Sequence, residues 1–284
     1  MDRCFQIGDF CFRLICPAQA VPPKNFMRFA CEGKTPVYTY VVELAERFPA
    51  PRGKLIASRA DLAVFAQDGL EQRFLGVRGK AGFYAVYTEE SASRASVLLA
   101  KDALLGMHID PYFVSLLALE RRMLALGGIV LHCAYMRYKG RAILFSAPSE
   151  TGKTTQATLW EKHRGSRVIN GDRALLQQIG GVWMARGWPV CGSSEVCHNE
   201  DTPIDAIVML SQSKENKASR LSPAQAFSMI YSQITINRWN EEGHKQAMDQ
   251  IERLVTQVPV WHLGCTISEE AVACLARALY PGEE

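Results

Sequence analysis

The sequence predicts an α/β protein in two parts, a small β-rich N-terminal domain over residues 1–125 and a second domain over residues 126–284. Two observations support this prediction. Short apolar and aromatic runs interrupted by turn residues fill most of the first part, which is typical of strands. In the second part strand-like runs occur together with helical patterns, and one stretch, Arg141–Trp160, has the order strand, loop and helix start.

The composition is that of a globular protein. The chain has 284 residues, of which 48% are hydrophobic and 21% charged, so each part is able to bury a core. The net charge is +3 without a long run of Lys or Arg, which argues against a nucleic-acid partner. No stretch approaches the ~20 continuous apolar residues of a membrane span, so we expect no membrane partner.

The N-terminus and the cysteines indicate the cellular compartment. The first residues include acids and lack the basic-then-apolar order of a signal peptide. The nine cysteines are odd in number and scattered, so we expect reduced thiols in a cytoplasmic protein. Cys191, Cys197 and His198 are metal-ligand types, but their loose spacing is weak evidence for a metal site.

In the first part the strongest strand candidate is Val37–Val42, which is rich in β-branched and aromatic residues. Shorter strands are expected near residues 55–56, 64–65, 72–77 and 82–87. No group of residues in this part has a recognisable chemistry. We expect a small sheet that could present an edge or a face to a partner or substrate.

A helix and a hairpin lead from the first part into the second. Asp110 and Pro111 start a helix that we expect to run to Gly127, because Asp caps and Pro suits the first helical position. A strand over residues 129–138 follows. The turn Lys139–Gly140 then joins it to the next strand in a tight hairpin.

The stretch Arg141–Trp160 matches the phosphate-binding P-loop. An apolar strand, Ala142–Phe145, leads into a loop of small residues, and Lys153-Thr154-Thr155 opens a helical pattern. Unpaired N–H groups and the helix dipole favour an anion at such a helix start. We expect Lys153 to contact the β- and γ-phosphates and Thr154 to offer its hydroxyl to Mg²⁺.

The P-loop departs from the consensus at three positions. Ala147 replaces the first glycine, and Pro148 has no N–H group to donate to a phosphate. Glu150 puts a carboxylate beside the expected anion site, where it repels phosphate unless the side chain turns outward. The alternative reading is a helix-start loop with a chance GKT sequence.

An acidic residue follows the P-loop helix in the order expected for nucleotide-binding proteins. A strand over residues 167–176 is interrupted at Gly171 and Asp172, and an acid at this place holds Mg²⁺ or orients the acceptor. The alternative for Asp172 is a turn residue in a hairpin. Arg173 balances the charge of Asp172, contacts phosphate, or is a solvated surface residue.

The remaining elements surround these motifs. Gly180–Gly181 is a hairpin turn, and Asp205–Leu210 is a buried strand. Ser211–Lys217 is a polar loop, either a flexible connection or a lid that brings Lys214 or Lys217 to phosphate. Helices are expected from Ser222, from about residue 241 to 255, and from Ser268 to about residue 280, with a strand over residues 258–263.

Three segments, Leu131–Ala134, Ala147–Thr155 and Asn170–Arg173, resemble the HPr kinase/phosphorylase and PEP-carboxykinase superfamily, and are most similar to HPr-kinase-related proteins. The resemblance covers roughly residues 128–264. It implies a P-loop domain with a mixed sheet, a histidine near the phosphates at His132, and an acidic pair after the P-loop. Gly171 stands where the first acid of that pair is expected, and the relatives usually have Gly in place of Glu150. Neither the HPr kinase C-terminal signature nor the carboxykinase substrate residues have a counterpart.

The motifs and the resemblance together predict ATP-dependent phosphoryl transfer to a hydroxyl group, with serine of a peptide, a protein or a free amino acid as the implied acceptor. The cofactors expected are ATP and Mg²⁺. The alternative is a nucleotide-binding regulatory or scaffold protein with little turnover, which Glu150 and Gly171 favour. A motor or transporter ATPase is disfavoured, because no LSGGQ-like sequence is present. A homo-oligomer is left open.

The candidate residues fall into four groups by role. The catalytic candidates are Asp172, His132 and Lys153. The nucleotide-binding candidates are Ser149, Glu150, Thr151, Gly152, Lys153, Thr154 and Thr155. The metal candidates are Thr154 and Asp172. The acceptor candidates are Arg173 and three residues of the loop Gly187–Ser194, namely Gly192, Ser193 and Ser194. The small residues of this loop would let a ligand approach the backbone, and the alternative is a structural loop held by Trp188.

Overall fold

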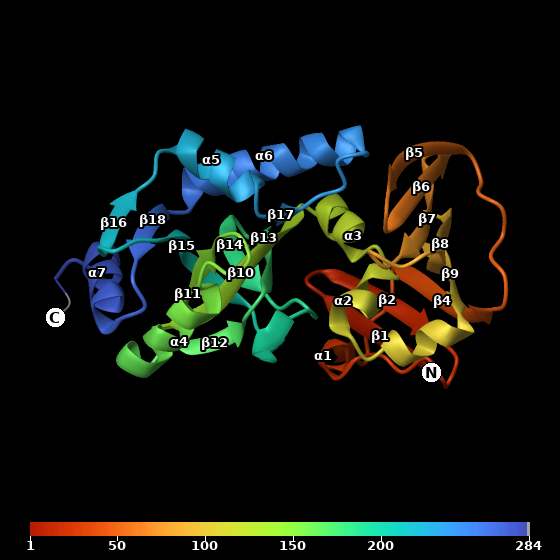
Figure 1. Cartoon of the computed structure of the whole chain (residues 1–284), viewed down its shortest axis with the longest axis horizontal. Coiled ribbons are helices and arrows are strands. Elements are labelled where there is room, and N and C mark those ends of the chain that lie inside the picture. The colour runs from red at the N-terminus through yellow and green to blue at the C-terminus, as the bar shows by residue number, and fades with distance from the viewer. Residues whose placement is uncertain (283–284) are drawn as a thin grey trace. The chain divides into compact units, whose positions relative to one another are not determined.

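The computed structural model describes residues 1–282 and divides into two compact units, Met1–Arg122 and Met123–Glu284 (Figure 1). Both units contain a mixed sheet with more strands than helices. No helix in the described residues is both long and apolar enough to cross a membrane.

The first unit is built on a nine-stranded sheet with the strand order β3-β1-β2-β4-β9-β8-β7-β6-β5. The pairs β2–β4 and β4–β9 are parallel and the other pairs are antiparallel. The elements of this unit are β1 (Asp2–Ile7), β2 (Phe10–Ile15), α1 (Lys24–Met27), β3 (Ala30–Cys31), β4 (Tyr38–Ala45), β5 (Lys54–Arg59), β6 (Leu62–Gln67), β7 (Leu70–Gly76), β8 (Phe83–Ser91), β9 (Arg94–Ala100), η1 (Lys101–Gly106) and α2 (Asp110–Ser115).

Aromatic side chains form much of the core of the first unit. Phe5 and Phe12, paired across β1 and β2, stack with ring centroids 5.8 Å apart. Phe26 from α1 contacts Phe5, and Phe113 from α2 contacts Phe26, so the two short helices are joined to the sheet through one aromatic cluster. The alternation of aromatic and polar residues in the strands places these rings on the same face.

The prediction of a single helix over residues 110–127 is wrong in one respect, because the helix is broken in the middle. The chain forms α2 and then α3 (Leu119–Ala125), with a break at Leu116–Ala118. Ala118 has a φ of 46°, and a residue in the left-handed region cannot continue a right-handed helix. All three residues of the break are buried, so tertiary packing outweighs their helix propensity.

The second unit contains a mixed sheet that includes both hairpins and parallel pairs. The pairs β11–β15 and β15–β18 are parallel, whereas β10–β11, β10–β13 and β13–β14 are antiparallel. Its elements are β10 (Gly128–Tyr138), β11 (Arg141–Ser146), α4 (Lys153–Arg164), β12 (Arg167–Asn170), β13 (Arg173–Ile179), β14 (Val182–Arg186), η2 (Gly192–Ser194), β15 (Thr202–Gln212), β16 (Lys217–Arg220), α5 (Pro223–Tyr231), β17 (Ile234–Thr235), α6 (Glu241–Gln257), β18 (Val260–Cys265) and α7 (Glu269–Leu279).

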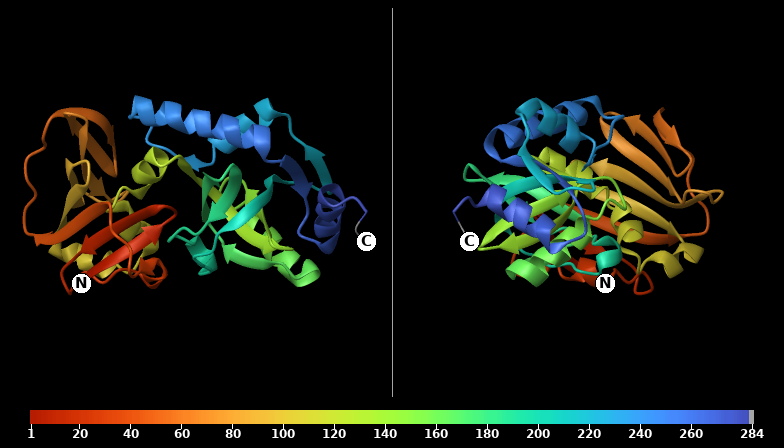
Figure 2. Two further views of the ribbon diagram at one scale, coloured as in Figure 1. Left: turned by 180° about the vertical axis from the view of Figure 1, so that it is seen from behind. Right: turned by 60° about the vertical axis from the view of Figure 1, so that its left-hand side comes forward.

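Helices cover both faces of this second sheet (Figures 1 and 2). Residues of α5 and α6 share one hydrophobic cluster with one face of β10, β11 and β15. Residues of α4 and α7 share a second cluster with the opposite face. Successive residues of β11 alternate between the clusters, Leu144 in the first and Phe145 in the second, as the period of a strand requires.

The strand β10 is paired on both of its edges along most of its length. One edge pairs first with β13 and then with β12. The other edge pairs first with β17 and then with β11. The hairpin of β10 and β11, predicted from Lys139–Gly140, is confirmed, and so is the hairpin of β13 and β14.

Candidate functional site

The segment from β11 to α4 has the order strand, loop and helix that is predicted for a P-loop. The loop occupies residues 147–152, and α4 begins at Lys153. The side chain of Trp160, fully buried, anchors α4 against the sheet through Tyr138 and Phe145. The first N–H groups of α4 have no partner within the helix, so they are available to an anion at the loop.

The lysine of this loop is held in place by backbone carbonyls. Nζ of Lys153 donates to the carbonyl oxygens of Ala147 at 3.0 Å and Pro148 at 3.1 Å. Burial lowers the pKa of Lys153, and the charge of Asp172 opposes that shift. The Nζ group is therefore fixed next to the loop, in the electrostatic field of Asp172.

Glu150 occupies an unusual backbone position in the loop. Its φ is 64°, a region that favours glycine, and its side chain is exposed. Its carbonyl oxygen accepts a hydrogen bond from Nε2 of Gln212 at 3.5 Å. Gly152, directly before α4, has a φ of 106° and needs the freedom of glycine. The hydroxyl of Thr151 donates to the carbonyl of Pro148 at 2.9 Å, inside the loop.

The register of β10 brings the predicted motifs together. Cys133 lies opposite Ser146, the last residue of β11, so the predicted P-loop begins at this level on one edge of β10. The N–H of Cys133 donates to the carbonyl of Asp172 at 2.9 Å, so Asp172 lies at the same level on the other edge. His132, the neighbouring residue, therefore stands between the two motifs.

The carboxylate of Asp172 contacts two basic side chains. Nε2 of His132 is 3.2 Å from Oδ1, and Nε of Arg173 donates to Oδ2 at 3.1 Å. Burial alone would raise the pKa of Asp172, but the hydrogen bond of His132 and the charge of Arg173 outweigh it, so this pKa lies below its ordinary value of 3.8. At neutral pH the group is a carboxylate, able to accept a hydroxyl proton or bind a cation.

A buried asparagine fixes the turn that carries Asp172. Oδ1 of Asn170 accepts from the N–H groups of Asp172 and Arg173, both at 2.9 Å. Its Nδ2 donates to the carbonyls of Trp188 at 2.9 Å and Val190 at 3.1 Å. Asn170 is fully buried, and its four hydrogen bonds join the turn between β12 and β13 to the loop that follows β14.

Thr154 and Asp172 converge from the two sides of β10. The hydroxyl of Thr154 donates to the carbonyl of Gly171 at 3.2 Å, next to Asp172 in the chain. One hydroxyl and one carboxylate suit Mg²⁺, which keeps several waters and is usually bound by few protein groups together with substrate phosphates. These two donors therefore fit the metal role expected from the sequence.

The loop of small residues packs on the Asp172 turn. A Cβ at Gly171 would lie 2.0 Å from Oγ of Ser194, and a Cβ at Gly192 would lie 3.2 Å from Cβ of Asp172. The hydroxyl of Ser194 donates to the carbonyl of Cys191 at 2.7 Å and accepts from the N–H of Val196 at 3.2 Å. Gly192 and Ser193 are exposed in this turn. A substrate role for Gly192, Ser193 and Ser194 stays a prediction, with Ser194 engaged inside the turn.

Two site residues were missed by the sequence reasoning besides Asn170. Oγ1 of Thr235 accepts from Arg173 at 2.7 Å, and the carbonyl of Gln233 accepts from the N–H of His132 at 2.9 Å. Both belong to or adjoin β17, which has only two residues and no hydrophobic pattern of its own. Asn170 was detectable in principle, since Asn before Gly is a turn signal.

The weak metal candidate at Cys191, Cys197 and His198 has other contacts. Sγ of Cys197 lies 3.4 Å from the carbonyl of Trp188, and Nδ1 of His198 is 3.5 Å from Arg167. Within residues 1–282, no group of three or more His, Cys, Asp or Glu residues is arranged to hold a metal ion. A metal at Thr154 and Asp172 would therefore depend on ligands that the nucleotide and water provide.

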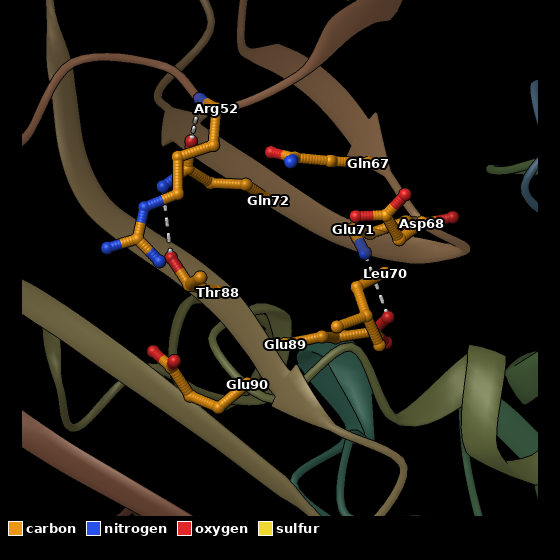
Figure 3. Close-up of a pocket in the computed structure, with 9 residues that line it drawn as sticks. All are labelled: Arg52, Gln67, Asp68, Leu70, Glu71, Gln72, Thr88, Glu89 and Glu90. Atoms are coloured by element: carbon orange, nitrogen blue, oxygen red, sulfur yellow. Dashed lines mark hydrogen bonds between the residues drawn. The ribbon is translucent and has the colours of Figure 1, made fainter.

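A polar hollow of about 220 Å³ lies in the first unit (Figure 3). Its buried acids are committed to the structure: Glu71 pairs with Arg73 at 2.7 Å, and Glu89 pairs with Arg121 at 2.9 Å. Figure 3 shows the side chain of Arg52 extending over the hollow. The lining residues are Arg52, Gln67, Asp68, Leu70, Glu71, Gln72, Thr88, Glu89 and Glu90.

Comparison with known proteins identifies the family. The family model described as SynChlorMet cassette protein ScmC matches residues 106–278, more than half of the chain. The chain belongs to the ScmC family. The part that matches this ScmC model includes His132, the loop between β11 and α4, and Asp172.

Other comparisons give little beyond the ScmC family. Among solved structures, the Hpr(Ser) kinase/phosphatase from Coxiella burnetii is similar over 52% of this chain and 94% of that one, at 10% identity and a TM-score of 0.31. This is a weak similarity, and no conclusion about function follows from it. No curated protein matches the chain.

Proposed function

We propose that the chain is an ATP-dependent kinase that transfers a phosphoryl group to a hydroxyl, with serine of a peptide, a protein or a free amino acid as the acceptor. One observation supports this most strongly. The predicted P-loop and the Asp172 turn lie at the same level on opposite edges of β10, where Cys133 is opposite Ser146 and its N–H donates to the carbonyl of Asp172. In this proposal the groups that bind phosphate lie on one side of His132 and the carboxylate of Asp172 on the other.

The residues present account for most of what phosphoryl transfer requires. Such catalysis consists largely of positioning and charge neutralisation. The N–H groups of α4 and the ammonium of Lys153 bind the phosphates of ATP. Asp172 accepts the hydrogen bond of the acceptor hydroxyl, whose oxygen forms the new P–O bond while ADP leaves and the proton passes to Asp172 or to water. Mg²⁺, held by Thr154 and Asp172, would neutralise phosphate charge.

His132 and Arg173 position the carboxylate in this scheme. Each contacts one oxygen of Asp172, and together they keep its pKa low. Arg173 is also anchored to Thr235, so its guanidinium is fixed beside the carboxylate. A hydroxyl that reaches Asp172 must share an oxygen with one of these partners or replace it.

A regulatory or scaffold protein with little turnover is the second candidate, and specific observations favour it. Both oxygens of Asp172 already have protein partners. A second acid cannot occupy position 171, because Ser194 fills the space that its side chain needs. In this case ATP binds but no phosphoryl group is transferred.

The experiment that tests the proposal combines calorimetry with a screen of acceptors using labelled ATP. For Lys153→Met we expect ATP affinity to fall about 10- to 100-fold, because a charge-assisted contact contributes ~1.5–3 kcal/mol. Asp172→Asn should retain ATP binding and lose transfer by ~10²–10⁴-fold, the usual effect of removing a general base. Unchanged ATP affinity in Lys153→Met would refute the nucleotide site. ATP binding without transfer to any acceptor would instead support the scaffold.

A further inference from the structure

The P-loop has a second side, which faces away from Asp172. In the sheet, β10 with His132 lies next to β11, and β15 and then β18 follow on the other side of β11. The strands β11, β15 and β18 are parallel, so their carboxyl ends lie at one edge of the sheet. The P-loop follows the first of these ends, and Gln212 and Cys265 are the last residues of the other two.

The ends of β15 and β18 are bonded directly to the P-loop and to α4. Nε2 of Gln212 donates to the carbonyl of Glu150 at 3.5 Å. Nε2 of Gln156, the fourth residue of α4, donates to the carbonyl of Thr266 at 2.9 Å and lies 3.3 Å from Sγ of Cys265. Residues 212–216 and 265–268 thus form a rim beside the phosphate site, which we call the β15–β18 rim.

The β15–β18 rim is a tied structure. The N–H of Ser213 donates to the carbonyl of Cys265 at 3.1 Å. Oδ1 of Asn216 accepts from the N–H of Thr266 at 2.8 Å and from its hydroxyl at 3.2 Å. The polar loop expected from the sequence as a flexible connection or a lid is therefore bonded at both ends, and it offers a preformed surface.

The direction of a bound nucleotide follows from the order of these parts. The phosphoryl group that is transferred must lie near Asp172, on the β10 side of the loop. The nucleoside at the other end of the triphosphate then lies on the β15 and β18 side. Ligands of open α/β sheets bind outside the carboxyl ends of the strands, which agrees with this direction.

An exposed isoleucine provides an apolar surface on the rim. The side chain of Ile267 is 75% exposed. Ile267 directly precedes Ser268, the N-cap of α7. An apolar residue at this position often packs against the fourth residue of the helix, here Val272, as a hydrophobic staple. The high exposure of Ile267 shows that such packing leaves most of its surface open to a ligand.

We propose that the β15–β18 rim is the nucleoside subsite of the ATP site, with Ile267 as the apolar surface against which the base packs. This inference rests on the proposed nucleotide-binding function. It assigns the phosphates to the P-loop and Lys153, and the nucleoside to residues 212–216 and 265–268. The two parts of the ligand can therefore be tested separately.

The test compares ATP with inorganic tripolyphosphate, both with Mg²⁺, by calorimetry on the full chain. The variant Ile267→Ser removes the apolar surface without adding charge, at an exposed position where folding should be preserved. We expect about fivefold weaker ATP binding, from the loss of one partly buried apolar contact. Tripolyphosphate binding should change less than twofold, because it has no nucleoside.

The matched control is Ile179→Ser. Ile179 is also an exposed isoleucine, 42% exposed, at the end of β13 away from the site. It should leave the binding of both ligands unchanged. Equal ATP affinity in wild type and Ile267→Ser would overturn the inference, and so would an equal loss for both ligands. If wild type binds neither ligand, the proposed function itself fails. If tripolyphosphate binding depends on Lys153 but ATP binds no more tightly than tripolyphosphate, the nucleoside subsite is refuted and the phosphate site is not.

Discussion

At the residue scale, the site combines groups that the sequence reveals with groups that only the fold reveals. Lys153 and Asp172 were predicted because each stands at a fixed place in a motif whose chemistry requires that residue type. Asn170 was missed although it makes four hydrogen bonds, because its partners are backbone groups that the sequence does not place. A side chain that serves the backbone has no chemical signature of its own.

The left-handed backbone at Glu150 gives the first prediction. A residue with a Cβ costs roughly 1–2 kcal/mol at such a φ, so Glu150→Gly should raise the free energy of unfolding by about 1 kcal/mol. Glu150→Ala is the control, since it removes the charge and keeps the Cβ. Denaturant unfolding should show no increase in the free energy of unfolding for Glu150→Ala. If Ala and Gly stabilise equally, charge and not backbone conformation limits this position.

The contact between Gly171 and Ser194 gives the second prediction. Gly171→Ala should destabilise the chain by roughly 1–3 kcal/mol, because the new methyl group overlaps Ser194. Ser194→Gly alone should cost about 1 kcal/mol, through the loss of its hydrogen bonds. The double variant should be more stable than the two single effects added together. Additive effects in denaturant unfolding would mean that the two residues do not share this space.

At the scale of elements, hairpins were predictable and distant pairings were not. The turns Lys139–Gly140 and Gly180–Gly181 lie between strand patterns that are adjacent in the sequence, so the partners were evident. The pairing of β17 with β10 joins residues about a hundred positions apart through a two-residue strand. No periodicity exists over two residues, and this pairing is decided by tertiary packing. The break between α2 and α3 was missed for the same reason.

The turn between β12 and β13 gives the third prediction. Asn170→Ala leaves two N–H groups and two carbonyls without their buried partner, and we expect a loss of about 3 kcal/mol in the free energy of unfolding. Phosphoryl transfer should fall further than ATP affinity, since the turn carries Asp172 and not the P-loop.

Gln178→Ala is the matched control for this amide. Gln178 lies on the neighbouring strand β13 and bonds only at exposed positions, to the carbonyl of Gly181 and to Gln257. Its loss should cost less than about 0.5 kcal/mol. An Asn170→Ala variant with native stability and transfer would show that the turn does not need this side chain.

At the scale of the whole molecule, all candidate site residues lie in the second unit, within Met123–Glu284. The β-rich character of the first part was predicted from its aromatic and β-branched runs, and it is confirmed by the nine-stranded sheet. The strand order of that sheet could not be predicted from the sequence. The strand β4 pairs in parallel with β2 and with β9, and a hairpin pattern predicts only antiparallel pairs of strands that are adjacent in the sequence.

The buried thiols of the two units give the fourth prediction. Cys11 and Cys16 are buried in the first unit, and Cys133, Cys191, Cys197 and Cys265 are buried in the second. A ligand at 100 times its Kd stabilises the state that binds it by ≈ 2.7 kcal/mol. In mild denaturant, ATP with Mg²⁺ should therefore slow the labelling of the second set and leave the first set unchanged. Mass spectrometry of labelled peptides measures both. Equal protection of the two sets would show that the units unfold together.

The two hydrogen bonds of Lys153 to the loop fix its side chain before a ligand binds. A lysine side chain that becomes fixed gives up ~1.5–2 kcal/mol of rotamer entropy. Here folding has already imposed that loss, since Nζ is held by the carbonyls of Ala147 and Pro148. A phosphate that binds here therefore meets a fixed lysine side chain and replaces a carbonyl oxygen as the hydrogen-bond partner of Nζ. Phosphate affinity is therefore not reduced by the entropy of ordering this side chain, which is the advantage of preorganisation.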